Sequence, residues 1–165
     1  MNSTIFSYLV GLMMCLAAVV FVSLYFVTAG YGQFRTKQWG WSIAGKVAWM
    51  LMELPVFIVM LGIWWLSPLK WQLPQLVFFL LFELHYLQRS LVFPLLMKGR
   101  SLMPVSIITM GIVFNVANGV LQGGGLYWFP NPDYQDGAAY LLRWNAIAGI
   151  LLFLVGMAVN LHSDH

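Results

Sequence analysis

Five long apolar segments occupy most of the 165-residue chain. A helix needs about 20 apolar residues to cross the hydrocarbon core of a bilayer. The sequence therefore predicts an all-α fold, a multi-pass membrane bundle within a single domain. The expected membrane-spanning helices lie approximately at residues 5–27, 43–66, 74–97, 103–122 and 139–161.

The composition supports a membrane protein and argues against nucleic-acid binding. Hydrophobic residues make up 61% of the chain and charged residues 8%, whereas soluble domains carry about 25% charged residues. The net charge of +3 comes from scattered lysines and arginines that form no basic stripe. We expect the lipid bilayer, and no nucleic acid, as a partner. The oligomeric state cannot be read from the sequence.

The lysines and arginines predict how the chain is oriented. Cytoplasmic connections carry an excess of these residues, and here they concentrate in the first and third connections. These residues are Arg35, Lys37, Lys46, Lys98 and Arg100. We therefore expect both connections and the C-terminal end in the cytosol, with the N-terminus outside or lumenal. The membrane would be the inner or plasma membrane in a bacterium and the endoplasmic reticulum in a eukaryote.

Proline and glycine predict local breaks in the helices. Pro55 and Pro94 lie inside expected spans and should kink them. The fourth connection, residues 123–137, contains a triple glycine and a Pro-Asn-Pro segment, which is typical of a long exposed loop.

Three of the apolar segments contain polar side chains that lipid does not accommodate. A charge at mid-bilayer costs about 3 kcal/mol or more, so such groups usually face one another or a polar cavity. Hydrogen bonds between helices would explain one such residue. Several in the third segment, together with Glu53 in the second, favour a polar pocket instead. Those of the third segment are Glu83, His85, Tyr86, Gln88 and Arg89.

Glu53 and Tyr86 are a chemically suitable pair within such a pocket. A protonated glutamate and a tyrosine hydroxyl can both donate hydrogen bonds to a carbonyl oxygen and polarise the carbonyl group. Arg89 lies one turn closer to the expected cytosolic end, where a fixed cation could bind a phosphate. Arg100 could bind phosphate too, or could only anchor its loop. Trp49, one turn before Glu53, would line the cavity, although a tryptophan near a membrane boundary is more often an interfacial anchor.

The end of the last apolar segment is also polar. Asn160 and Asp164 lie four residues apart, on one face of the expected helix. His162 and His165 beside them allow a metal site to be considered. Polar residues also mark where a helix leaves lipid, however, and we expect no metal here.

Several of these residues fall in segments that resemble the steroid 5-alpha-reductase family of membrane enzymes. The resemblance implies seven helices in the complete enzyme, of which five are here, so the chain corresponds to the N-terminal two-thirds. We expect the chain alone to be inactive, because much of the implied cofactor site lies beyond His165. The resembling segments, in family order, are 29–32, 49–55, 85–92, 99–100, 118–123 and 156–164.

The resemblance implies an oxidoreductase that reduces the carbon–carbon double bond conjugated to the 3-oxo group of a steroid or similar lipid enone. NADPH would be the hydride donor. Glu53 and Tyr86 would be the catalytic residues that hold the substrate carbonyl oxygen, and Trp49 would contact the substrate. The implied cofactor contacts are Tyr31, Arg89, Arg100, Asn160 and Asp164.

Two other functions stay open. A membrane lipid or isoprenylcysteine methyltransferase can share a related helical architecture, although methyl transfer does not need a pair of residues that polarises a carbonyl. A non-catalytic membrane remnant is the third interpretation, and cofactor binding would separate it from the two enzymes.

Overall fold

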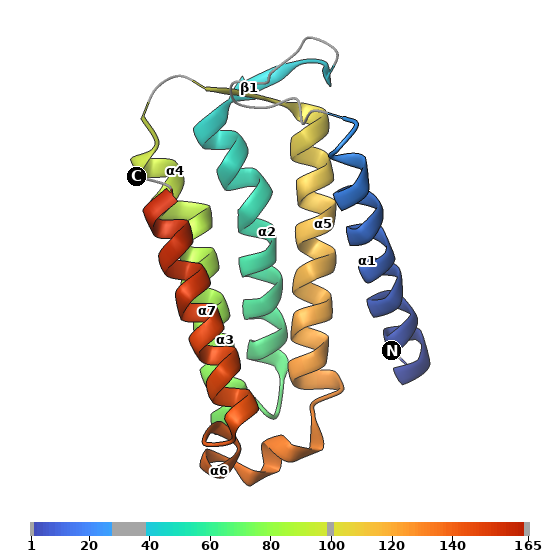
Figure 1. Ribbon diagram of the computed structural model, residues 1–165, viewed down its shortest axis with the longest axis vertical. Coiled ribbons are helices and arrows are strands. Elements are labelled where there is room, and N and C mark those ends of the chain that lie inside the picture. The colour runs from blue at the N-terminus through green and yellow to red at the C-terminus, as the bar shows by residue number, and fades with distance from the viewer. Residues whose placement is uncertain (1, 28–38, 99–100, 164–165) are drawn as a thin grey trace.

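The computed structural model describes residues 2–27, 39–98 and 101–163. It is a bundle of long helices that run side by side, with a short sheet across one end (Figure 1). Within the described ranges, five helical stretches are long and apolar enough to cross a membrane, which confirms the predicted all-α membrane bundle. They are α1 (Ser3–Ser23), α2 (Gly45–Leu66), the stretch Leu73–Leu96, the stretch Val105–Trp128 and α7 (Trp144–Ser163).

The sheet at one end of the bundle was not predicted from the sequence. Strand β1 (Ser42–Ala44) pairs antiparallel with β2 (Leu102–Pro104), with Ile43 opposite Met103. The sheet joins the connection before α2 to the connection before α5 (Val105–Gly123). We call this end of the bundle the strand end.

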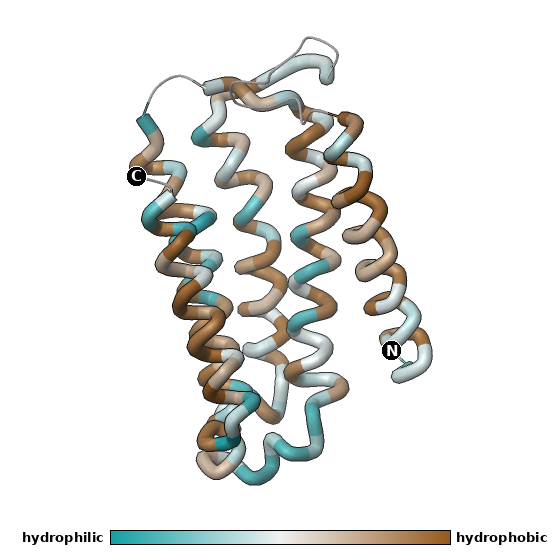
Figure 2. The backbone as a smooth tube through the Cα atoms, in the orientation of Figure 1, coloured by the Kyte–Doolittle hydropathy of each residue, from teal (hydrophilic) through white to brown (hydrophobic). Residues whose placement is uncertain are grey.

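The opposite end, which we call the loop end, carries two short helices. These are η5 (Pro132–Asp136) and α6 (Ala138–Leu141). Figure 2 shows apolar residues along most of the long helices and a hydrophilic stretch in this connection. Here Arg143 donates hydrogen bonds to Asp133 Oδ2, at 2.5 Å, and to Asp136 Oδ2. Burial, followed by the charge and the hydrogen bond of the neighbouring Tyr140 hydroxyl, raises the pKa of Tyr134 to about 12, so this phenol stays neutral at physiological pH.

Helices α2 and α5 form the most extensive helix pair in the bundle. Small residues on α5 allow this close approach, as is common between membrane helices. A Cβ atom on Gly119 would lie 3.0 Å from Val59 Cγ1 and 3.2 Å from the Val56 carbonyl oxygen. Helix α3 (Leu73–Leu87) packs on the other side of α2, while α1 lies at the far edge beside α5 (Figure 1).

The triple glycine is part of a helix rather than the start of an exposed loop, so that prediction is wrong. The chain continues from α5 into a π-helical segment, η4 (Gly124–Trp128), and Gly123 and Gly124 are buried. A Cβ atom at Gly123 would lie 2.7 Å from Ile63 Cδ1, and one at Gly124 would lie 2.7 Å from Phe6 Cε2. The glycines are therefore explained by tight packing against α2 and α1.

The two prolines within spans are accommodated in different ways. Pro55 lies inside the continuous helix α2. Pro94 lies at the start of α4 (Phe93–Leu96), directly after the π-helical segment η3 (Gln88–Val92). A proline ring clashes with the carbonyl group four residues earlier in an α-helix. For Pro94 that carbonyl group belongs to Ser90, which lies within the wider π-helical turn of η3. This turn directly follows α3, the helix that carries Tyr86.

Candidate functional site

Glu53 is buried on the face of α2 that packs against α5. Its Oε2 accepts a hydrogen bond of 3.3 Å from Asn115 Nδ2. The same amide nitrogen donates to the Met52 carbonyl oxygen at 2.7 Å. Asn115, itself buried, therefore fixes the glutamate side chain against the middle of α5.

Tyr86 is held in a similar way by the next polar residue of α5. Asn118 Nδ2 donates a hydrogen bond of 2.9 Å to the Tyr86 hydroxyl oxygen. Because Asn118 is the donor, the hydroxyl can still donate its own hydrogen to a further acceptor. The Phe82 ring, one turn earlier on α3, packs against the Tyr86 ring with centroids 4.6 Å apart.

The two candidate catalytic residues lie in one electrostatic environment. Glu53 and Tyr86 are close enough for the charge of the carboxylate to act on the phenol, and the charge of Arg89 acts on both. Helix α5 supplies the amide partner of each, three residues apart on one helix face. The structure thus brings together Glu53 of α2, Tyr86 of α3 and Arg89 of η3.

Arg89 lies against an aromatic pair, a contact that the sequence did not predict. Its guanidinium carbon is 4.9 Å from the ring centroid of Trp49 and 4.9 Å from that of Phe93. These two rings meet edge to face with centroids 5.5 Å apart. Cation–π contacts of this kind hold a guanidinium group in a defined position. Trp49 therefore borders the site through Arg89, on the strand-end side of Glu53.

The remaining predicted cofactor contacts are only partly described by the structure. Asn160 lies near the strand end of α7, where its side chain is exposed. Tyr31, Arg100 and Asp164 lie outside the described residues, so their placement stays a prediction.

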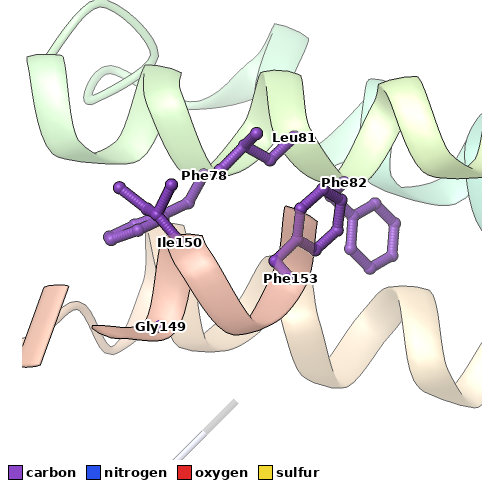
Figure 3. A pocket seen from close by; sticks show the side chains of 6 residues that line it. All are labelled: Phe78, Leu81, Phe82, Gly149, Ile150 and Phe153. Atoms are coloured by element: carbon purple, nitrogen blue, oxygen red, sulfur yellow. The ribbon is translucent and has the colours of Figure 1, made fainter. Parts of the chain in front are cut away.

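A separate apolar crevice of about 290 Å³ lies between α3 and α7 (Figure 3). It contains no polar side chain that could polarise a carbonyl group. It borders the site through Phe82, which also packs on Tyr86. The residues that line it are Phe78, Leu81, Phe82, Gly149, Ile150 and Phe153.

Asn115 and Asn118 are the residues that sequence reasoning missed. A signal for them exists, because they are polar, lie inside an apolar segment and are spaced to share one helix face. Asn118 belongs to a segment that carried the family resemblance, but no role was predicted for it.

Residues 101–165 match the family model described as 3-oxo-5-alpha-steroid 4-dehydrogenase. The steroid 5-alpha-reductase DET2 of Gossypium hirsutum is 32% identical over 99% of this chain and 64% of its own length. The 3-oxo-5-alpha-steroid 4-dehydrogenase 2 of Homo sapiens is 38% identical over 83% of this chain and 53% of its own length. The enzyme of that name from Sus scrofa is 36% identical over 91% of this chain and 59% of its own length.

The chain is similar in sequence to the steroid 5-alpha-reductases over most of its length. The resemblance predicted from the sequence is thereby confirmed. These relatives are named as steroid reductases or steroid dehydrogenases. The five apolar helices within the described ranges support an integral membrane protein. The chain spans between about half and two-thirds of the length of these relatives.

Proposed function

We propose that the complete protein is a membrane steroid reductase that uses NADPH. It would reduce the double bond conjugated to the carbonyl group of a 3-oxo-4-ene steroid or a similar lipid enone. The observation that supports this most is the placement of Glu53 and Tyr86. They come from separate helices, they interact electrostatically, and each is held by an asparagine of α5.

These two residues would act on the substrate carbonyl oxygen. As the carbon β to the carbonyl accepts a hydride, negative charge develops on that oxygen. The Tyr86 hydroxyl can donate a hydrogen bond to it, and so can Glu53 when protonated. Donors that are already fixed in position stabilise developing charge without a cost of reorganisation. A proton then adds to the carbon α to the carbonyl and completes the reduction.

NADPH would supply the hydride when bound. Among the described residues, Arg89 and Asn160 are the predicted cofactor contacts, and both lie toward the strand end. A guanidinium group and a carboxamide suit phosphate oxygens and ribose or nicotinamide groups, respectively. The cation–π contacts of Arg89 would position it while its N–H groups donate at the edge of the guanidinium plane.

We further propose that the strand end faces the cytosol, where NADPH is available. Strands β1 and β2, which complete the basic first and third connections in the sequence, both lie at the strand end (Figure 1). Lys46 also lies there, and its Nζ donates to the Leu95 carbonyl oxygen at 3.2 Å. The loop end, with Asp133 and Asp136, would face outside or the lumen.

The test is reduction of a defined enone by the full-length protein in its membrane. With NADPH and androst-4-en-3-one, we expect one 5-reduced steroid formed for each NADPH oxidised. A saturated steroid ketone should not stimulate NADPH oxidation. If no steroid or simpler lipid enone is reduced with NADPH, the proposed function is wrong.

A further inference from the structure

Asn115 makes two hydrogen bonds through one amide nitrogen, and together they fix which way its amide group faces. Its Nδ2 donates to the Met52 carbonyl oxygen at 2.7 Å and to Glu53 Oε2 at 3.3 Å. A backbone carbonyl oxygen only accepts hydrogen bonds, so the amide atom beside it must be the NH2 group and not the amide oxygen. Because only 5% of Asn115 is exposed, the protein and not bulk water sets this orientation.

The contact with Met52 anchors Asn115 to the backbone of α2. Pro55, three residues after Met52, lies inside this helix and has no N–H group. In membrane helices, side chains of neighbouring helices supply donors to the carbonyl groups around such a proline. The orientation of the Asn115 amide therefore does not depend on whether Glu53 carries a proton.

The second hydrogen of the same NH2 group restricts the carboxyl group of Glu53. An amide N–H group can only donate, so Oε2 must accept. A protonated carboxyl group has one O–H group, which donates, and one carbonyl oxygen, which accepts. With Oε2 as the acceptor, the hydrogen lies on Oε1, where it is available to a further acceptor.

Tyr86 is arranged in the same way by the neighbouring amide of α5. Asn118 Nδ2 donates to the Tyr86 hydroxyl oxygen at 2.9 Å, which leaves the hydroxyl hydrogen for another acceptor. Asn115 and Asn118 lie three residues apart, on one face of the helix. A carbonyl oxygen has two lone pairs and can accept both hydrogens. The two amides thus leave Glu53 and Tyr86 with one hydrogen each to donate.

We propose that Asn115 is a positioning residue that directs the proton of Glu53 to Oε1, from which it is donated to the carbonyl oxygen of the substrate. The inference rests on the proposed function, which places that oxygen at Glu53 and Tyr86. It assigns Glu53 the role of a hydrogen-bond donor rather than that of a negative charge. Without Asn115, the carboxyl group could carry its hydrogen on either oxygen, and only part of the molecules would present a donor to the substrate.

Infrared spectroscopy of the full-length protein tests the hydrogen bond without any turnover. The carboxyl C=O stretch of Glu53 is obtained as the difference from the same protein carrying Glu53→Gln, so that the contributions of Glu83 and the other carboxyl groups cancel. An accepted hydrogen bond weakens a C=O bond and lowers its stretching frequency. Asn115→Leu keeps the branched shape of the side chain and removes the donor. The Glu53 band should therefore move to higher frequency in this variant.

Steady-state kinetics then test the positioning role. In Asn115→Leu, kcat for reduction of androst-4-en-3-one should fall about tenfold, since a misplaced donor costs transition-state stabilisation. The KM of the steroid and the Kd of NADPH should change by less than about threefold, whereas a merely structural defect would raise both. Asn115→Ser serves if Asn115→Leu does not fold. Its shorter hydroxyl can bond to the carbonyl four residues earlier on its own helix, so the Glu53 band should shift in the same direction.

Asn118→Leu is the matched control for the infrared measurement. It removes the equivalent amide from Tyr86 and should leave the Glu53 band where it is. The inference is overturned if Glu53→Gln removes no carboxyl C=O band from the wild-type spectrum, because Glu53 would then be ionised. An unshifted band or near wild-type kcat in Asn115→Leu would overturn it too, as would an equal shift in Asn118→Leu. Absence of steroid reduction by the wild-type protein would contradict the proposed function, while the infrared bands would still test the hydrogen bond between Asn115 and Glu53.

Discussion

At the scale of single residues, the site depends on partners that hold reactive groups still. Glu53 and Tyr86 could be proposed from the sequence because acidic and phenolic groups are costly in a bilayer and must face each other or a cavity. Their amide partners on α5 could not be assigned, because the pairing depends on how α2, α3 and α5 are rotated against one another. The position of Arg89 over Trp49 depends on the same packing.

The first prediction concerns the two groups expected at the carbonyl oxygen. Glu53→Gln and Tyr86→Phe should each lower kcat by about 10²–10³-fold, the usual cost of losing one donor to developing negative charge. The Kd of NADPH should change little, because neither residue is expected to contact the cofactor phosphates. Steady-state kinetics and NADPH titration in the full-length protein measure the two effects. Near wild-type turnover in both variants would contradict the catalytic assignment.

Asn118 should act through Tyr86 and not on the substrate directly. Asn118→Leu removes the donor that lies 2.9 Å from the Tyr86 hydroxyl oxygen, and we expect roughly tenfold lower kcat. When two residues act as one unit, the effects of their substitutions on kcat do not add. The double variant Asn118→Leu/Tyr86→Phe should therefore be no slower than Tyr86→Phe alone. Additive losses would show that Asn118 has a separate role.

Arg89 has two possible roles that one variant can separate. If it binds a cofactor phosphate, Arg89→Ala should raise the Kd of NADPH by about tenfold or more, since charge-assisted hydrogen bonds are lost. The affinity for steroid should change less. Lys70→Ala, which removes a cation at the loop end, is the control and should leave NADPH binding unchanged. An unchanged Kd with a lower kcat would instead indicate that Arg89 only positions Glu53.

At the scale of elements, the length of the apolar segments predicted the five spanning helices. Residue type gave a wrong prediction where one kind of residue is common in two different structures. Glycine is common both in turns and where membrane helices approach closely. The triple glycine was therefore assigned to a loop, although the structure uses Gly123 and Gly124 for contact with α2 and α1. Only the neighbouring side chains, which are distant in the sequence, distinguish these uses.

Close packing of α2 and α5 gives a stability prediction. Gly119→Ala would bring a methyl group to 3.0 Å from Val59 Cγ1 and 3.2 Å from a backbone oxygen. We expect a loss of about 1–3 kcal/mol from overpacking, seen as a lower midpoint of thermal unfolding in detergent. Gly62→Ala is the control, because a Cβ atom there meets nothing within 4 Å. That substitution should be neutral or stabilising, and equal effects of the two would contradict the packing argument.

At the scale of the whole molecule, β1 and β2 end the basic first and third connections and pair with each other at the strand end. The sequence predicted their side of the membrane but not their contact, since pairing of three-residue strands leaves no periodic pattern. With the site residues Glu53, Tyr86 and Arg89 nearer this end than the loop end, the proposed orientation lets a cytosolic cofactor approach while the lipid substrate enters from the bilayer.

The orientation can be tested by cysteine labelling. Cys15 is the one cysteine of the sequence, so Cys15→Ser gives a background for single cysteines at exposed positions at opposite ends. Ser101→Cys places a thiol beside β2, and Gln135→Cys places one in η5. In intact cells or right-side-out vesicles, a membrane-impermeant maleimide should label Gln135→Cys and spare Ser101→Cys, whereas both should react after detergent is added. Labelling of Ser101→Cys alone from outside would invert the topology and place the proposed cofactor side away from cytosolic NADPH.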